Sequence, residues 1–264
     1  MFVSGVAARI IAGVDRAKLK QSVSFVVQGL NQLLWPAVCS NCGEGVFEGD
    51  EGLCRSCWDE LLACSGADYC PRCGRDASRY GIVEGACPDC QGKEFYFDGI
   101  ARAGVYAQSL RKMILAFKNG RTELDSVLGF LADSALGGGS FHSQIELFVP
   151  VPLHWSRRFF RGYNQSLVLV KKLKSMAAEI STDLVRIRRT KAQAMTASPA
   201  ARARNVAGAF GVRWGHSFAG RRICLVDDIK TTGATLNECA RTLKQAGASK
   251  VFALVLAVAG QKPA

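Results

Sequence analysis

The sequence predicts an α/β protein in which a mostly parallel sheet is flanked by helices and is preceded by a small cysteine-rich module. Apolar runs of strand length alternate with helical patterns in the later part of the 264-residue chain, which is typical of βαβ units. Eight of the 11 cysteines form four Cys-x-x-Cys pairs between residues 39 and 90. We therefore expect a helical leader at residues 1–38, the cysteine module at 39–95 and the sheet domain at 96–264.

The leader is expected to form an amphipathic helix. Between Arg16 and Trp35, Leu and Val residues recur at spacings of three and four, which places them on one side of a helix. We expect this side to pack on the protein; contact with a membrane surface or with a partner stays open. The sequence carries neither a secretory signal nor an apolar stretch of about 18 residues, so we predict no transmembrane segment and a cytoplasmic location.

The cysteine pairs predict two closed zinc sites. A Cys-x-x-Cys turn directs two sulfurs at one ion, and two such turns complete a tetrahedron that has no open position for a substrate. We expect about two structural zinc ions held by sequential pairs. Alternating pairs that share an ion, redox dithiols and an iron–sulfur cluster stay open as alternatives. The predicted metal ligands are Cys39, Cys42, Cys54, Cys57, Cys70, Cys73, Cys87 and Cys90.

Strands and helices alternate along the sheet domain. The signals are buried apolar runs for strands, apolar residues three and four apart for helices, and Gly, Pro or Asn-Gly at the ends. Ligands of such sheets bind at the carboxyl ends of the strands, so the site is expected there. In chain order we predict a strand at 97–106, a helix at 109–117, a flexible connection at 137–140, a strand at 145–151, a helix at 166–178, a strand at 223–226, a helix at 236–246 and a strand at 251–258.

The strand at 223–226 leads into a predicted sugar-phosphate loop. Small residues and glycine allow backbone N–H groups to surround a phosphate at a helix N-terminus, and threonine hydroxyls add donors. Asp227 and Asp228 can accept hydrogen bonds from neighbouring ribose hydroxyls, and we assign them the catalytic role. A capped turn without a ligand is the plainer alternative. The other residues expected to bind ligand here are Lys230, Thr231, Thr232, Gly233, Ala234 and Thr235.

Residues 224–235 resemble the phosphoribosyl-pyrophosphate (PRPP) binding signature of type I phosphoribosyltransferases, and the chain from about Cys39 onward is similar to one branch, the ComF/GntX family. The resemblance implies a type I phosphoribosyltransferase-like fold, Mg²⁺ bound with PRPP, and displacement of pyrophosphate at ribose C1 by a nitrogen nucleophile. It also implies that Arg161 lies on a pyrophosphate loop and Lys191 on a flexible loop that closes over substrate. Besides the cysteine module and the signature, it rests on Lys118-Asn119-Gly120, Val149-Pro150-Val151-Pro152-Leu153, Arg161-Gly162-Tyr163-Asn164-Gln165 and Arg189-Thr190-Lys191-Ala192-Gln193.

One position departs from the signature. Ile229 and Lys230 lie where many transferases carry another acid or a small residue before Thr-Thr-Gly, so a catalytic base is not obvious from the sequence.

Positive charge is concentrated in one segment. The net charge is +12 at pH 7, and residues 151–222 hold 15 Lys and Arg against two acids, whereas the rest of the chain holds 19 against 20. Such a bias suits a polyanion, which is either a phosphate-rich small molecule or nucleic acid.

The resemblance implies a PRPP-binding, phosphoribosyltransferase-like protein that serves DNA uptake and competence or nucleotide metabolism. The implied partners are PRPP or another ribose 5-phosphate compound, single-stranded DNA and a competence helicase. The alternative is a non-catalytic factor that uses the transferase fold to handle single-stranded DNA.

Overall fold

The computed structural model describes residues 37–46, 52–65, 68–90, 92–153, 162–190 and 198–260. The chain divides into two compact units, Met1–Cys54 and Arg55–Ala264. The helix predicted between residues 16 and 35 lies outside the described residues. The predicted division after residue 95 stays a prediction.

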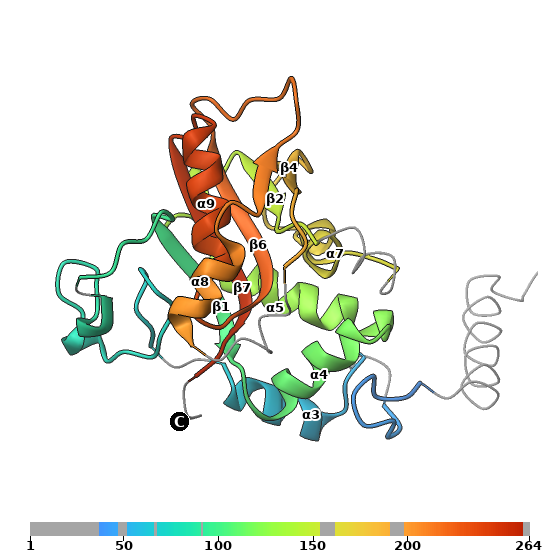
Figure 1. The fold of residues 1–264 in the computed structure, drawn as a ribbon. Coiled ribbons are helices and arrows are strands. Elements are labelled where there is room, and N and C mark those ends of the chain that lie inside the picture. The colour runs from blue at the N-terminus through green and yellow to red at the C-terminus, as the bar shows by residue number, and fades with distance from the viewer. Residues whose placement is uncertain are drawn as a thin grey trace, which may run out of the picture. The chain divides into compact units, whose positions relative to one another are not determined.

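A five-stranded sheet in the order β1-β7-β6-β2-β3 forms the centre of the second unit (Figure 1). Its neighbouring strands all pair in parallel. This confirms the predicted parallel sheet and the predicted strands around residues 97–106, 145–151, 223–226 and 251–258. The strands are β1 (Gly99–Val105), β2 (Leu147–Pro150), β3 (Glu179–Ile180), β6 (Arg222–Lys230) and β7 (Lys250–Val258).

Strand β7 shows why the sheet forms. Its sequence, KVFALVLAV, is an unbroken apolar run after the first residue, and every residue from Val251 to Val258 is buried. Strands that are covered on both faces read in this way, without the alternation of a half-exposed strand. The run therefore requires layers of helices on both sides.

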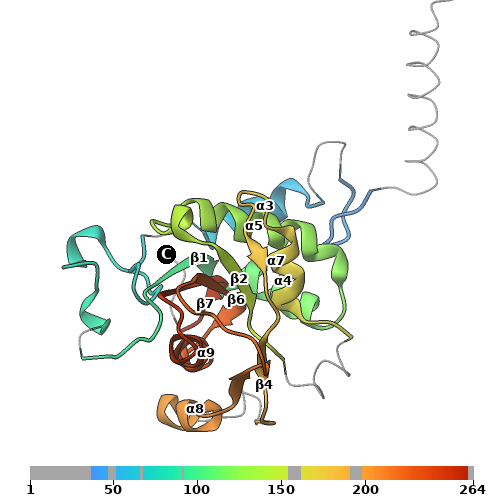
Figure 2. The same ribbon diagram turned by 90° about the horizontal axis from the view of Figure 1, so that it is seen from above.

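Helices cover both faces of the sheet, as Figure 2 shows for α5 and α7 on one side and α9 on the other. Leu236, Cys239 and Leu243 of α9 pack with Ile223 and Leu225 of β6 in one buried cluster. The fold is the predicted parallel sheet flanked by helices. The α-helices described in this unit are α3 (Arg55–Ala63), α4 (Gln108–Lys118), α5 (Asp125–Gly137), α7 (Gln165–Lys172), α8 (Pro199–Val206) and α9 (Ala234–Gln245).

Two helices differ from the sequence prediction. Helix α5 was not predicted, because its apolar residues do not form a single stripe and Gly129 interrupts them. A Cβ atom at Gly129 would lie 2.4 Å from Cβ of Lys172, so the glycine permits close packing of α5 against α7. Helix α7 ends at Lys172 instead of reaching residue 178, because Asp133 of α5 accepts hydrogen bonds from the backbone N–H groups of Lys174 and Ser175, both at 3.0 Å.

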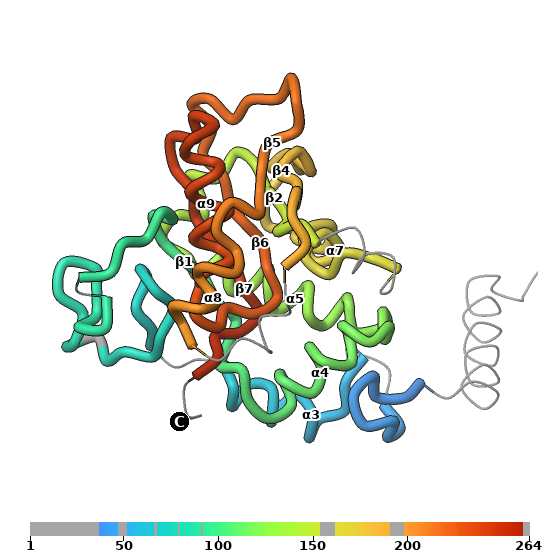
Figure 3. The backbone as a smooth tube through the Cα atoms, viewed as in Figure 1, coloured from blue at the N-terminus to red at the C-terminus, as the bar shows by residue number. Residues whose placement is uncertain are grey.

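A second, smaller sheet also escaped prediction. Strands β4 (Leu184–Arg186) and β5 (Phe210–Val212) pair in antiparallel fashion (Figure 3). Each strand is only three residues long, too short for a periodic signal in the sequence. Among the described residues, no helix has the length and apolarity needed to cross a membrane.

Candidate functional site

The predicted sugar-phosphate loop is the turn between β6 and α9. Gly233 adopts φ +84°, a left-handed conformation that glycine reaches without strain, and it directly precedes the first residue of α9. The backbone N–H of Asn237 donates to the Gly233 carbonyl at 2.8 Å, which closes the first helical turn. The turn and the start of the helix line one small hollow, and its walls are Asp227, Ile229, Lys230, Thr231, Thr232, Gly233, Ala234, Thr235 and Leu236.

The two carboxylates lie within the strand and not beyond it, which corrects the predicted strand end at Val226. Strand β6 continues to Lys230, and Asp227 pairs with Val255 of β7 inside the sheet. Successive side chains of a strand point to opposite faces, so Asp227 and Asp228 leave the strand in different directions. Asp228 is buried, with 8% of its surface exposed.

Asp227 is a partly buried carboxyl group whose neighbours shift its pKa. Its Oδ1 accepts hydrogen bonds from the backbone N–H of Asp228 at 2.9 Å and from the hydroxyl of Ser166 at 3.3 Å. Burial, followed by the neighbouring charge of Asp228, raises the pKa of Asp227 to about 7, against the lowering effect of Lys118.

Lys118 is a site residue that the sequence analysis did not assign. It occupies the last turn of α4, and its Nζ lies 2.9 Å from Oδ1 of Asp228. The last turn of α4 therefore reaches the carboxyl end of β6. The sequence signal was present in Lys118-Asn119-Gly120, but only the tertiary arrangement connects this lysine with the carboxylates.

Residues from Gly162 onward form hydrogen bonds that connect α7 with β2, α4 and the carboxylates of β6. The side chain of Asn164 accepts a hydrogen bond from the Ser166 backbone at 3.1 Å, which caps α7, and donates to the Val151 carbonyl at 3.2 Å. The Tyr163 hydroxyl donates to the carbonyl of Phe117, next to Lys118. These bonds place Ser166 beside Asp227. Arg161 and Lys191, which were predicted to bind ligand, lie outside the described residues.

Both cysteine clusters have the predicted sequential composition. The ligand sulfurs of Cys39, Cys42, Cys54 and Cys57 lie within 4.8 Å of one another, and so do those of Cys70, Cys73, Cys87 and Cys90. The sulfur atoms of Cys42 and Cys54 are 3.6 Å apart, and those of Cys73 and Cys87 are 3.7 Å apart. Thiolates at about 2.3 Å from a tetrahedral zinc ion stand about 3.8 Å apart, so this spacing fits structural zinc.

The thiols of the second cluster differ in their pKa values. Burial raises the pKa of Cys70, but hydrogen bonds from neighbouring backbone N–H groups outweigh this effect and lower it to about 7. Burial, followed by the neighbouring thiols, instead raises the pKa of Cys90. Four ionised thiols at this separation repel one another, so a divalent cation is needed to hold all of them as thiolates.

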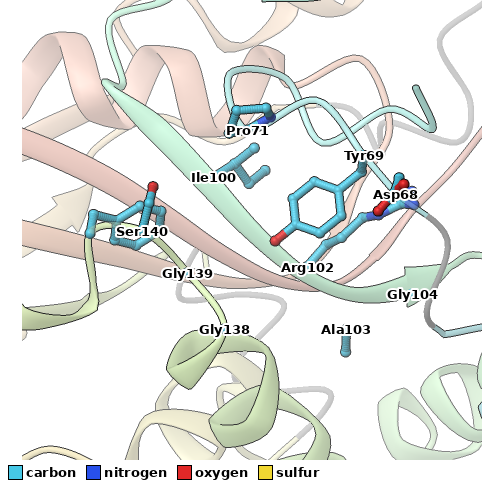
Figure 4. A pocket seen from close by; sticks show the side chains of 11 residues that line it. Asp68, Tyr69, Pro71, Ile100, Arg102, Ala103, Gly104, Gly138, Gly139 and Ser140 are labelled. Atoms are coloured by element: carbon cyan, nitrogen blue, oxygen red, sulfur yellow. The ribbon is translucent and has the colours of Figure 1, made fainter. Parts of the chain in front are cut away.

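The second cluster is seated directly on the sheet. The carbonyl of Pro71 accepts a hydrogen bond from the Ile100 backbone at 2.8 Å, and a Cβ atom at Gly74 would lie 3.2 Å from Val258 of β7. The buried Arg102 of β1 pairs with Asp76, and its guanidinium lies 4.9 Å from the centre of the Tyr69 ring. Figure 4 shows Tyr69 and Pro71 beside Ile100 and Arg102. These residues line a cavity of about 410 Å³, whose lining does not include the sugar-phosphate loop.

This arrangement can recognise a sugar phosphate. Donors at the start of α9 face a hollow where the helix dipole favours an anion. Two carboxylates at the same edge of the sheet offer acceptors for hydroxyl groups, and Lys118 supplies a positive charge beside them.

Two domain families match the chain. The Double zinc ribbon domain matches residues 30–91, and the Phosphoribosyl transferase domain matches residues 164–264. Among solved structures, a purine phosphoribosyltransferase from Pyrococcus horikoshii superposes with a TM-score of 0.32 and 14% identity, over 52% of this chain and 79% of that chain.

Curated relatives cover most of the chain. Competence protein F of Haemophilus influenzae is 29% identical over 220 residues, which span 81% of this chain and 93% of that protein. DNA utilization protein YhgH of Escherichia coli O157:H7 is 30% identical over 222 residues, which span 82% of this chain and 94% of that protein. Because these relatives reach 30% identity and cover most of both chains, the chain belongs to the ComF family, and in this chain a double zinc ribbon precedes a phosphoribosyltransferase domain.

Proposed function

We propose that this chain binds PRPP, or another ribose 5-phosphate compound, with Mg²⁺ at the β6–α9 loop and acts as a PRPP-dependent phosphoribosyltransferase. The main support for this proposal is the order of the functional groups along the segment between β6 and α9. Two carboxylates, Asp227 and Asp228, are followed within a few residues by a glycine turn with threonine hydroxyls and a helix N-terminus.

Each group has a part in this proposal. Backbone N–H groups and hydroxyls of residues 231–235 hold the 5′-phosphate, while Asp227 and Asp228 accept hydrogen bonds from the ribose hydroxyls and position C1. Mg²⁺ supplies charge neutralisation on the diphosphate when it is bound. A nitrogen nucleophile displaces pyrophosphate at C1, and no covalent bond to the protein is needed. We assign Arg161 and Lys191 to the diphosphate, because a guanidinium fork and an ammonium suit phosphate oxygens.

Lys118 balances negative charge at the site in this proposal, first on Asp228 and then on pyrophosphate. Without ligand, its ammonium balances Asp228 at 2.9 Å. When ribose hydroxyls take over as donors to the carboxylate, the ammonium becomes available to stabilise the negative charge that develops on departing pyrophosphate.

The names of the relatives extend the proposal to a cellular role. Competence protein F and DNA utilization protein YhgH are named for competence and for DNA utilization. We propose that this chain serves DNA uptake or use in the cytoplasm, with single-stranded DNA and a competence helicase as partners. The segment at residues 151–222, with 15 basic and two acidic residues, supports contact with a polyanion, and eight closely set thiols suit a reducing compartment.

Calorimetry with ribose 5-phosphate in the presence of Mg²⁺ tests the proposed ligand. Asp228→Asn keeps an acceptor oxygen but loses the charge that strengthens hydrogen bonds from hydroxyls, a loss of roughly 1.5–3 kcal/mol, so affinity should fall by about one to two orders of magnitude. Asp59→Asn, which makes the same change on the exposed side of α3, is the matched control and should bind as the wild type does. Absence of any binding to wild type at millimolar concentration would sink the proposal.

A further inference from the structure

Lys230 has an environment that the sugar-phosphate loop alone does not explain. It is the last residue of β6, directly before Thr231, and only 4% of its surface is exposed. Within the described part of the chain, no hydrogen bond or salt bridge reaches its ammonium group. A buried charge is costly unless another charge balances it, so a compensating group must lie nearby.

The second cysteine cluster lies close to Lys230. Lys230 and Cys73 line the same cavity of about 290 Å³, together with Thr231 and Thr232 of the loop. A Cβ atom at Gly74, the residue after Cys73, would lie 3.2 Å from Val258, and Val258 is the partner of Lys230 in the pairing of β6 with β7. One wall of the cavity is therefore the metal site, and another is the sugar-phosphate loop.

The charges around the cavity identify Lys230 as a counter-ion. Four thiolates on a zinc ion carry a net charge of about −2. Arg75 already pairs with Asp89 at 3.0 Å, and Lys93 is exposed to solvent. Of these three cations on the cavity wall, Lys230 alone is buried, and it has no carboxylate within bonding distance among the described residues.

The position of Lys230 also affects the turn of the loop. A Cβ atom at Gly233 would lie 3.0 Å from Cε of Lys230, so the lysine side chain runs directly beneath the glycine that starts α9. The side chain of Lys230 therefore supports the turn from below.

We propose that Lys230 is a positioning residue that links the second metal site to the sugar-phosphate loop. Its ammonium balances the zinc-bound thiolates of Cys70, Cys73, Cys87 and Cys90, and its stem holds the turn in the form that binds ligand. The link rests on the proposed ribose 5-phosphate binding. Because linkage is reciprocal, ligand at the loop stabilises the metal site and metal stabilises ligand binding.

The reactivity of individual cysteines tests the link. The zinc-loaded full chain is mixed with a chelator and an alkylating reagent, and the rate of modification at Cys73 and Cys90 is followed by peptide mass spectrometry. In wild type, saturating ribose 5-phosphate should slow this rate about fivefold or more, the usual size of such coupling. Alkylation of Cys39 in the first cluster reports any general change in reactivity.

Variants separate a counter-ion from a direct phosphate ligand. Lys230→Met should speed alkylation of Cys73 without ligand and abolish the protection by ribose 5-phosphate, whereas Lys230→Arg, which keeps the charge, should restore both. Lys112→Met removes the same charge from an exposed position of α4 and should behave as wild type. A lysine that only contacts phosphate would weaken ligand binding in Lys230→Met and leave ligand-free alkylation of Cys73 unchanged.

The experiment distinguishes failure of the Lys230 inference from failure of the proposed function. Equal ligand-free alkylation rates at Cys73 in wild type and Lys230→Met overturn the inference, whatever the loop binds. Failure of wild type to bind ribose 5-phosphate overturns the proposed function instead, and the ligand-free comparison still decides the role of Lys230. If Lys230→Met does not fold, the absence of protection in wild type that binds ribose 5-phosphate overturns the link by itself.

Discussion

At the scale of single residues, the candidate site combines groups that are visible in the sequence with groups that only the fold brings together. Asp227 and Asp228 stand out in the sequence because two acids precede a Thr-Gly turn. Lys118 and Ser166 contact them from helices about 110 and 60 residues earlier in the chain. Sequence patterns describe local order along the chain, so contacts of this range could not be predicted from them.

Asp227→Asn should make the protein more stable at neutral pH while weakening its binding of ribose 5-phosphate. Burial and the charge of Asp228 raise the pKa of Asp227 to about 7 in the folded protein, far above the ordinary range of a carboxyl group. As the pH rises from about 4 to 7, the unfolded chain releases this proton and the folded chain keeps it, so stability falls across that window. Asparagine does not titrate and escapes this loss.

Thermal unfolding of both proteins between pH 4 and 8 measures the effect. The midpoints should be similar near pH 4, and the variant should unfold at least about 2 °C higher at pH 7.5. Asp59→Asn, an exposed substitution of the same kind, should show no such pH-dependent gap. A variant less stable than wild type at pH 7.5 would show that the carboxylate of Asp227 stabilises the fold.

At the scale of elements, the sequence predicted which segments are strands and helices better than it predicted where they end. The buried runs of β1, β6 and β7 and the amphipathic pattern of α9 are strong local signals. The end of β6 was predicted too early. Two aspartates and a lysine have low strand propensity, but pairing with β7 extends the strand to include them. Tertiary pairing overrides propensity at the site itself.

Gly233→Ala should weaken the loop more than the fold. A non-glycine residue at φ +84° is strained by about 1–2 kcal/mol, and here the added methyl group would also press on the stem of Lys230. We expect affinity for ribose 5-phosphate to fall about tenfold or more in calorimetry. Gly220→Ala creates comparable strain at φ +72°, where nothing lies within 4 Å of the new methyl group, and serves as the control.

Gly233→Ala should lose at least as much stability as Gly220→Ala, and only Gly233→Ala should lose ligand affinity. Equal affinity in both variants would mean that the turn at Gly233 does not contact the phosphate.

At the scale of the whole molecule, the sequence predicted both metal clusters and the parallel sheet domain. The cysteine spacing was sufficient to predict the Cys-x-x-Cys turns, because each turn is a local structure, but it left open whether sequential or alternating turns share an ion. The structure brings sequential turns together. How the second cluster meets the sheet was not predictable, because Pro71 and Gly74 contact Ile100 and Val258 through shape and backbone hydrogen bonds. This packing places Cys73 in the wall of a cavity that Lys230, Thr231 and Thr232 also line.

The purified chain should contain about two zinc ions, one for each set of four cysteines. Metal analysis should give about one zinc ion for Cys39→Ser and for Cys70→Ser, since a tetrahedral site that loses one of its four thiolates binds zinc far more weakly. Cys224→Ala removes a buried thiol of β6 that belongs to neither cluster, so this variant should retain both ions. Removal of zinc by a chelator should lower the unfolding temperature of wild type, because the binding free energy of a structural site contributes to folding. Iron with visible absorbance, or no metal at all in protein purified without chelators, would contradict structural zinc; a wild-type content near one would assign a closed site to only one of the two clusters.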